Sequence, residues 1–404
     1  MKHLLLSFVT CLILLQSCSV DSSNPDLLSP DKEDMLSQET DLFIDQKEAE
    51  ILSNQFVIWN EKIETRGIEK QILNTSVVQS EDVSYDALMY IINYTDGFTV
   101  ISATKGIYPI LAYSDKGSLN IDDTTNIGLS IWIDCMKKDI AIEMNKPSND
   151  PYKLEKYNYL KTQFAESKKV DISTRAPIYI DEIRNYVKVG PHLITEWDQG
   201  DPYNKYIPNK YPAGCVPVAI AQVVNYHRRL NGENIDFTAT NNGNNDAIAK
   251  LIAKIGSGID MVYKKDGSYP DYCLNPFNLF CYRGRIENYL NARGYIASYT
   301  DNFNKKPTTV PAIYEAYKEG FLGITALGKG HTWVMDGYES YDIYQGWFEL
   351  PEVRSSYEPG RVWGVLYLHF NWGWKDGYQN GWYGVSSSYL DYSNSAKRLE
   401  IRKR

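Results

Sequence analysis

One cysteine of the 404-residue chain lies where a thiol can be made reactive. Cys215 follows Gly214 in the stretch AGCVPVAIAQVVNYH, and the apolar run after it predicts a buried helix. Pro217 fits only the first turn of a helix, where its missing N–H is not needed. The thiol therefore lies at the positive end of the helix dipole, which favours the thiolate. The alternative is a small buried side chain that packs at a helix start.

A thiolate nucleophile needs a base to take and return protons, and four of the five histidines are poor candidates for it. His3 lies in the N-terminal leader, His192 lies in a loop pattern, and His369 lies in an apolar strand pattern typical of a packed residue. His227 ends the Cys215 helix, three turns or roughly 18 Å from the thiol. His331 follows a Gly-Lys-Gly stretch and starts the strand pattern HTWVMDGY, so it can point across a cleft; an ordinary strand-end histidine is the alternative.

Two further positions carry polar groups that fit the same chemistry. Gln199 lies shortly before the cysteine, and its amide can donate a hydrogen bond to an oxyanion. Asn371 and Trp372 open the stretch NWGW. An asparagine can orient an imidazole, and an indole can shield that contact from water. Aromatic packing at a strand end is the alternative interpretation of this stretch.

The order Gln, Cys, His, Asn-Trp resembles the streptopain family of papain-like cysteine peptidases. The matching stretches are TEWDQGDPYN, AGCVPVAIAQVVNYH, GKGHTWVMDGY and HFNWGWKDGYQNGWY, which fall within residues 190–390. Upstream, DGFTVISATKGIYPILAYSDKG is similar to the inhibitory propeptide of that family. The resemblance therefore spans both halves of the chain.

The resemblance implies a role for each of these residues. Cys215 is the nucleophile, and His331 is the general base and then the acid toward the leaving amine. Gln199 and the backbone N–H of Cys215 form the oxyanion hole. Asn371 or Trp372 orients or shields the histidine, and their adjacency leaves open which of them contacts the ring. The chemistry implies no metal and no cofactor, with protein or peptide substrates and the chain's own propeptide as an intramolecular inhibitor.

Residue patterns in the first half predict a small α+β domain. Helical patterns at 45–66 and 124–165 flank three short strands in 87–120, where apolar runs surround the hairpin-forming pair Asp96 and Gly97. We expect this propeptide domain to span residues 45–165. Residues 166–175 are polar and lack periodicity, so we interpret them as a linker and processing region.

The second half, residues 176–404, is predicted to be the peptidase domain. Helical patterns at 216–230 and 245–261 precede a series of strand patterns. This order fits an α+β domain in which a helix packs on a twisted antiparallel sheet. With the resemblance, the expected fold is a papain-like catalytic domain whose nucleophile is on that helix.

The N-terminal leader, residues 1–18, predicts export. A basic start precedes an apolar run that is too short to span a bilayer, and the segment ends at Cys18. This resembles a bacterial lipoprotein signal with Cys18 lipidated; a conventional secretory signal is the alternative. Residues 19–44 are polar and acidic, as in a tether. We expect a cell-envelope lipoprotein of the outer membrane or cell surface, with a catalytic half that is released or stays associated after processing.

Composition excludes some other classes of function. The net charge is −9 and no basic cluster stands out, so nucleic acid is not an expected partner. No cysteines have CxxC spacing, which argues against a zinc site. Cys273 and Cys281 flank a short loop and can pair in an oxidising compartment, whereas Cys135 fits a small buried side chain in a helix.

Two rival functions fit parts of the same sequence. The 32 tyrosines and 9 tryptophans also suit a surface lipoprotein that binds glycan or protein ligands without catalysis. A papain-like fold can also perform other acyl chemistry, such as amide hydrolysis in small molecules or transfer to an amine.

Overall fold

The computed structural model describes residues 42–64, 70–79, 85–123, 125–145, 152–166, 182–270, 280–300, 322–325, 331–344, 361–374, 377–385 and 398–404. Leu42–Arg404 form one compact unit. The predicted leader with Cys18, nearly all of the tether, the linker beyond Glu166, and Cys273 and Cys281 lie outside the described residues. The predicted domain boundaries stay predictions.

In the described part of the N-terminal half, one helix is followed by four short strands and then by two helices. Its elements are α1 (Gln46–Glu64), β1 (Ile72–Val78), β2 (Met89–Tyr94), β3 (Phe98–Ser102), β4 (Ile110–Ser114), α2 (Ile127–Met144) and α3 (Tyr152–Glu166). The three strands predicted around the Asp96–Gly97 turn are β2, β3 and β4. The long helical pattern 124–165 is two helices, and β1 was not predicted.

The described part of the C-terminal half begins with one strand, continues mainly with helices and ends with a series of strands. Its elements are β5 (Glu182–Val189), η1 (Pro208–Lys210), α4 (Cys215–His227), α5 (Phe237–Asn241), α6 (Asn245–Gly258), β6 (Met261–Val262), β7 (Tyr269–Pro270), α7 (Phe280–Asn291), β8 (Tyr295–Thr300), β9 (Leu322–Thr325), β10 (Trp333–Tyr344), β11 (Arg361–Asn371), β12 (Gly381–Gly384) and β13 (Arg398–Lys403). The helix predicted at the cysteine is α4, and α6 is the second predicted helix.

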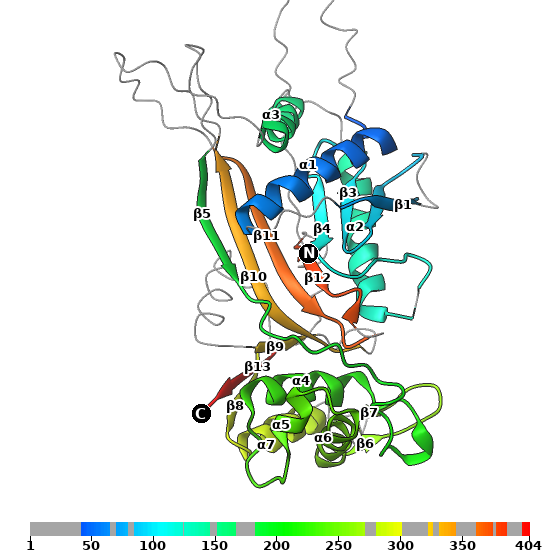
Figure 1. Ribbon diagram of the computed structural model, residues 1–404, viewed down its shortest axis with the longest axis vertical. Coiled ribbons are helices and arrows are strands. Elements are labelled where there is room, and N and C mark those ends of the chain that lie inside the picture. Colours follow the sequence, from blue (N-terminus) through cyan, green and yellow to red (C-terminus); the bar gives the residue numbers. More distant parts are fainter. Residues whose placement is uncertain are drawn as a thin grey trace, which may run out of the picture. The chain divides into compact units, whose positions relative to one another are not determined.

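One antiparallel sheet runs through both halves (Figure 1). Its strand order is β1-β2-β3-β4-β12-β11-β10-β9-β13-β8, and β5 also pairs with β10. The junction is the pairing of β4 with β12, where Tyr113 lies opposite Trp382 and Ala112 opposite Tyr383. The N-terminal half therefore docks on the C-terminal half by extending its sheet.

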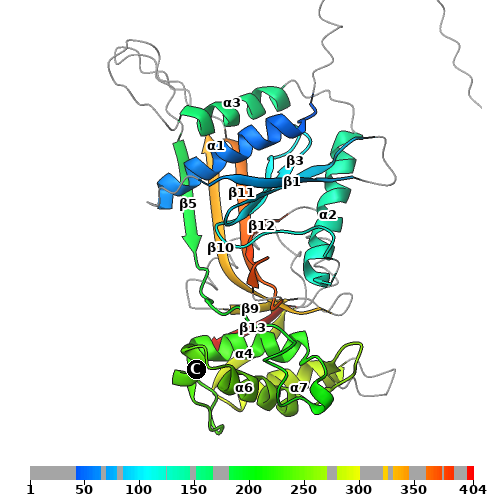
Figure 2. The ribbon, with the colours of Figure 1, turned by 45° about the vertical axis from the view of Figure 1, so that its right-hand side comes forward.

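Helices of the N-terminal half cover both faces of the sheet around this junction (Figure 2). Neighbouring strand residues point to opposite faces. Accordingly, Tyr113 and Trp382 share a core with side chains of α1 and α3, including Phe56. Their neighbours Ala112 and Tyr383 share another core with α2, including Trp132. Cys135 of α2 is buried in the second core, as predicted for a small apolar side chain.

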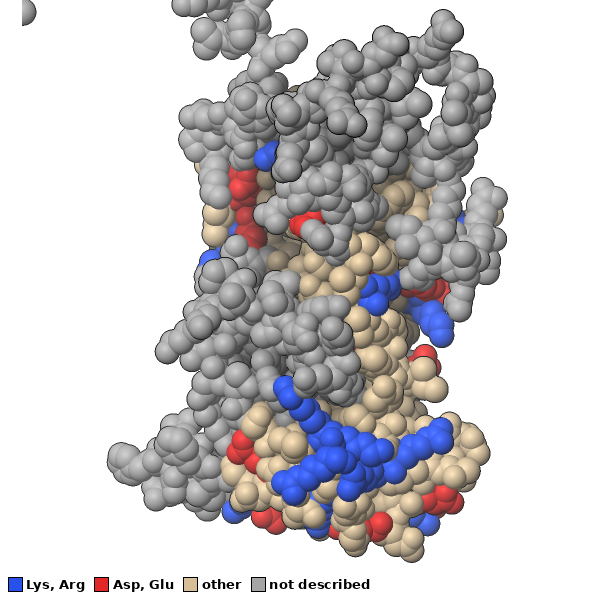
Figure 3. Space-filling view, turned by 90° about the vertical axis from the view of Figure 1, so that its left-hand side faces the viewer, with Lys and Arg blue, Asp and Glu red and all other residues tan. Residues whose placement is uncertain are grey.

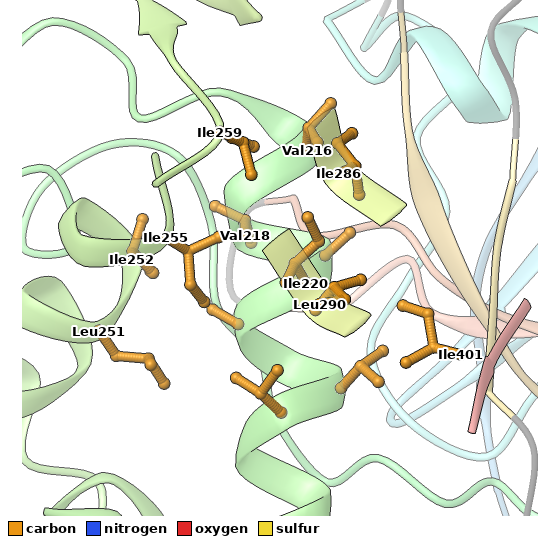
Figure 4. Close-up of a cluster of buried hydrophobic side chains, with 14 of the residues drawn as sticks. Val216, Val218, Ile220, Leu251, Ile252, Ile255, Ile259, Ile286, Leu290 and Ile401 are labelled. Atoms are coloured by element: carbon orange, nitrogen blue, oxygen red, sulfur yellow. The ribbon is translucent and has the colours of Figure 1, made fainter. Parts of the chain in front are cut away.

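Helix α4 is held in place by a third core beneath the sheet (Figure 4). Side chains from α4, α6, α7 and β13 converge there, among them Val218, Ile255, Leu290 and Ile401. Ten of the thirteen α4 residues are buried. Because burying a Val, Leu or Ile side chain stabilises by about 1.5–3 kcal/mol, this core fixes the first turn of α4 and the cysteine in it.

Basic side chains gather on one face of the C-terminal half (Figure 3). The C-terminal end of α4 meets the end of β13, where an Arg229 side-chain N–H donates to the Arg404 carbonyl at 2.6 Å and Lys403 Nζ lies 3.5 Å from the His227 carbonyl. These cations are far apart in the sequence, so no basic cluster stood out there. Within the part of the chain that the structure describes, no helix has the length and apolarity to cross a membrane.

A buried polar contact across the junction gives a first test. Tyr113 donates a hydrogen bond to the buried carboxylate of Glu339, and Lys188 Nζ lies 3.8 Å from the same oxygen. Tyr113→Phe removes a donor from a buried charge, so we expect the free energy of unfolding of the full chain to fall by about 1–3 kcal/mol. The control is Tyr206→Phe, whose hydroxyl bonds Asp246 on the surface. Equal losses in denaturant unfolding for the two variants would contradict this role of the junction.

Candidate active site

Cys215 is the first residue of α4, as the sequence predicted. Gly214 caps the helix with φ 91°, a conformation that suits glycine, and no side chain caps the first turn. The backbone N–H groups of that turn are therefore available to a group placed there. Cys215 forms no disulfide and is partly buried.

The thiol of Cys215 contacts the residue next to the predicted base. Burial raises the pKa of the Cys215 thiol, and hydrogen bonds with the backbone and side chain of Thr332 and with the backbone of Cys215 and Val216 oppose that shift. Burial outweighs them, so the thiol is protonated at neutral pH in this structure. Thr332 was not predicted from the sequence as part of the site.

His331 is buried among aromatic rings and is not paired with the thiol. Its ring lies 6.0 Å from that of Trp333 and 6.1 Å from that of Trp374, centroid to centroid. Burial lowers the pKa of His331 to about 4, against a hydrogen bond with the Trp372 backbone that raises it. The other ring nitrogen, Nε2, is buried with no hydrogen-bond partner among the described residues. The ring is therefore neutral at pH 7 and makes no hydrogen bond to Sγ of Cys215.

Gln199 lies in the loop that precedes α4 and is tied back to it. Its backbone carbonyl accepts a hydrogen bond from the Ala213 N–H at 2.8 Å, two residues before the cysteine. Thr195 of the same loop donates to Gln222 of α4 at 2.6 Å. These bonds bring the backbone of Gln199 to the same end of α4 as the thiol.

Asn371 and Trp372 contact different partners. The buried amide of Asn371 donates to the Thr195 carbonyl at 2.8 Å, and its oxygen accepts from the Gly373 N–H at 3.1 Å. Trp372 bonds His331 through its backbone, and its indole N–H donates to the Gln379 carbonyl at 3.1 Å. Of the two predicted residues, Trp372 contacts the imidazole, whereas Asn371 holds the loop that carries Gln199.

The first turn of α2 fills the space beside His331. A Cβ added at Gly128 would lie 2.6 Å from two ring carbons of Trp372 and 3.1 Å from Cδ2 of His331. Two residues shortly before Gly128 also contact the C-terminal half. Asn126 donates a hydrogen bond to the Gln379 side chain at 2.7 Å, and the Thr125 hydroxyl accepts one from the Trp374 indole N–H at 3.2 Å. A segment of the N-terminal half thus packs directly on the predicted base.

Sequence reasoning missed most of this contact. Asn126 has the helix-capping pattern, since it accepts from the Leu129 N–H at 3.1 Å, but nothing local shows that Gln379 will be its other partner. Gly128 lies in the first turn of α2, and a glycine at this position is the one signal that a close approach occurs there. In the described part of the chain, no group of His, Cys, Asp or Glu side chains is arranged to hold a metal.

Comparisons with known proteins match one stretch in each half of the chain to a different family. Residues 42–140 match the model of the Spi protease inhibitor, and residues 197–244 match that of the Peptidase C10 family. No curated protein matches the chain. A solved structure of a prointerpain A fragment from Prevotella intermedia, carrying a Cys→Ala mutation, is similar with a TM-score of 0.50 and 19% identity. The match covers 82% of this chain and 98% of that one.

The structural likeness confirms the predicted α+β, papain-like fold with a propeptide domain. The two family matches confirm the predicted resemblance, one in each half of the chain. The glycan- or protein-binding lipoprotein without catalysis is therefore set aside. The two family matches together indicate a cysteine-type peptidase that carries an N-terminal inhibitory propeptide, similar to the Peptidase C10 family.

Proposed function

We propose that the protein is an exported cysteine endopeptidase, made as a latent zymogen, that cleaves peptide bonds with Cys215 and His331. The observation that carries this proposal is the position of the thiol. Cys215 lies at the free N-terminus of α4 and contacts Thr332, the residue after the histidine. Nucleophile and base are thus on adjoining elements, one on a helix and one at the start of β10.

The proposed reaction proceeds through a thioester. The Cys215 thiolate attacks the scissile carbonyl, and the oxyanion is held by the Gln199 amide and the Cys215 backbone N–H. His331 protonates the leaving amine, which releases the first product and leaves an acyl-enzyme. The neutral imidazole then takes a proton from water, which attacks the thioester and frees the second product as a carboxylate.

Latency follows from the surroundings of the two groups. Burial keeps the thiol protonated and the imidazole neutral, so no thiolate–imidazolium pair exists at pH 7. The α2 segment at Gly128 occupies the space next to the ring. We infer that removing this segment frees His331 to turn toward Sγ, which then ionises.

Processing and export complete the proposal. The expected cleavage region is 166–175, between the propeptide and the peptidase half, and the substrates are proteins or peptides. Cys18 would carry the lipid that anchors the precursor in the cell envelope, with three acyl chains each adding about 0.8 kcal/mol per buried methylene. Cleavage at 166–175 would separate the enzyme from that anchor, although the shared sheet between β4 and β12 favours continued association.

Substitutions at the nucleophile and the oxyanion donor test the reaction. We expect Cys215→Ala to abolish hydrolysis of a protein substrate, and Gln199→Ala to lower turnover by about 10²–10³ because one oxyanion donor is lost. Mass spectrometry of the products separates hydrolysis, which leaves a free carboxylate, from transfer, which leaves a new amide. Residual turnover in Cys215→Ala, or products joined only as amides, would refute the proposed reaction.

A substitution at the α2 contact tests the latency. Gly128→Ala places a methyl group against Trp372 and His331, and overpacking of this kind costs about 1–3 kcal/mol. We expect the propeptide to dock less firmly and the full chain to convert to the short active form severalfold faster on a gel time course. Gly284→Ala is the control, because its added Cβ meets only ordinary contacts in α7. Conversion of Gly128→Ala at the rate of the control would contradict the proposal.

Acidification offers a second test of the latency. The His331 pKa of about 4 lies below the ordinary value near 6.5, so the latent state binds fewer protons than an opened one. The contribution of the neutral His331 ring to the stability of the latent state is complete above about pH 6.5 and is lost as the pH drops toward 4. The total contribution is about 1.4 kcal/mol per unit of difference between the two pKa values. We expect the unfolding midpoint of Cys215→Ala full chain in denaturant to fall between pH 7 and pH 5.

The comparison that isolates His331 is the double variant Cys215→Ala/His331→Gln. Burial also lowers the pKa of His192 and of His227, and both variants keep these contributions. The variant without His331 should therefore lose less stability over the same pH range. An identical loss in the two proteins would show that His331 is not buried as a neutral ring.

A further inference from the structure

A buried Asp–His pair lies outside the proposed catalytic groups. Asp336 is fully buried on β10, and its Oδ1 lies 2.6 Å from Nδ1 of His369 on β11. Since a carboxylate only accepts hydrogen bonds, Nδ1 of His369 carries the proton in this contact. His369 also packs edge-on against Trp382, with 5.2 Å between the ring centroids. The pair is thus an ordered unit inside the sheet.

A β-bulge directs Asp336 away from the regular ladder. Met335 pairs with Phe370 and Gly337 pairs with His369, so Asp336 is the extra residue between two successive pairs. Bulges re-aim side chains and free backbone groups from the strand pairing. The groups of Asp336 that the ladder does not use are thereby available to another segment.

That segment is the start of the loop that carries Gln199. The Asp336 carbonyl accepts from the His192 N–H at 3.0 Å, and Oδ2 of its carboxylate accepts from the Leu193 N–H at 2.8 Å. The approach is close: a Cβ added at Gly190, whose φ is +85°, would lie 2.3 Å from the Asp336 carbonyl oxygen. One residue of β10 therefore fixes two consecutive N–H groups of the loop.

Further along, the loop is held at intervals up to Gln199. The Thr195 carbonyl accepts from Asn371 at 2.8 Å, and the Thr195 hydroxyl donates to Gln222 at 2.6 Å. The Gln199 carbonyl accepts from the Ala213 N–H at 2.8 Å. Asp336 is the anchor at the beginning of this series, and Ala213, beside the cysteine, is the anchor at its end.

We propose that Asp336, supported by His369, is a positioning residue that sets the Gln199 amide in the oxyanion hole through the loop 190–199. This inference rests on the proposed role of Gln199. His369 holds one carboxylate oxygen so that the other faces the Leu193 N–H. Without the pair, the loop keeps its anchor at Ala213 but loses the one that fixes its entry from β5, and Gln199 moves relative to the oxyanion.

The test is a double-mutant cycle between Asp336 and Gln199, measured on the full chain after conversion by a trace of tagged wild-type enzyme that is then removed. Asp336→Ala should lower turnover of a peptide substrate by about 10–10², since a displacement of about 1 Å has effects of this size. In the Gln199→Ala background the same substitution should lower turnover less than about threefold, because the donor that Asp336 positions is already absent. Asp336→Asn keeps an oxygen for the Leu193 N–H and should recover most of the turnover.

A second readout separates positioning from general damage. Alkylation of Cys215 by iodoacetamide requires an ionised thiol and no oxyanion hole, so its rate should be unchanged in Asp336→Ala. Thr240→Val is the matched control: it removes a buried hydrogen bond to Asn225 of α4, away from the loop. It should lower the melting temperature and leave turnover unchanged.

The outcomes are distinct. The positioning role would be overturned if Asp336→Ala lowered turnover by the same factor in the presence and absence of the Gln199 amide. It would also be overturned if the rate of Cys215 alkylation fell in parallel with turnover. If Gln199→Ala alone has no effect, the oxyanion assignment itself fails. If Asp336→Ala does not fold, the same double-mutant cycle is measured with His369→Phe. This variant keeps a ring against Trp382 but gives Oδ1 of Asp336 no donor. Turnover equal to that of the wild type would then overturn the proposal.

Discussion

Strand β12 pairs with β11 on one side and with β4 on the other, and the rest of the structure depends on this shared strand. Backbone pairing fixes the register of the inhibitory half on the peptidase half, because a shift by one residue would turn every side chain to the other face. The register brings the Tyr113 hydroxyl to the Glu339 carboxylate and brings the first turn of α2 to His331, just before β10. We therefore propose that inhibition follows from this sheet geometry.

Burial acts on both of the proposed catalytic groups in the direction that disfavours their charged forms. It raises the pKa of an acid and lowers the pKa of a base, so the Cys215 thiol and the His331 ring are each held neutral. Each would favour the charged form of the other if they met. Separating them therefore removes the mutual stabilisation, and the helix N-terminus alone does not overcome the burial of the thiol. The same helix position becomes activating once water and the imidazole reach it.

Much of the enzyme could be predicted from local sequence. Pro217 in the first turn fixed where α4 begins, and the Asp96–Gly97 turn fixed the hairpin of β2 and β3, since these signals depend only on the residues themselves. The joining of the two halves of the chain into one sheet could not be predicted, because edge pairing leaves no periodic signal. The partners of buried polar groups, such as Gln379 for Asn126 and Asp336 for His369, depend on strands far apart in the chain.

The most direct test of the account is the pH dependence of Cys215 alkylation by iodoacetamide, followed by peptide mapping, in the full chain and in the converted enzyme. We predict that the full chain labels slowly, and ever more slowly below pH 9, as a protonated thiol does. The converted enzyme should label fast and keep most of that rate down to about pH 5, because a thiolate–imidazolium pair persists there. Matching profiles in the two forms would contradict the claim that the propeptide keeps His331 from Cys215.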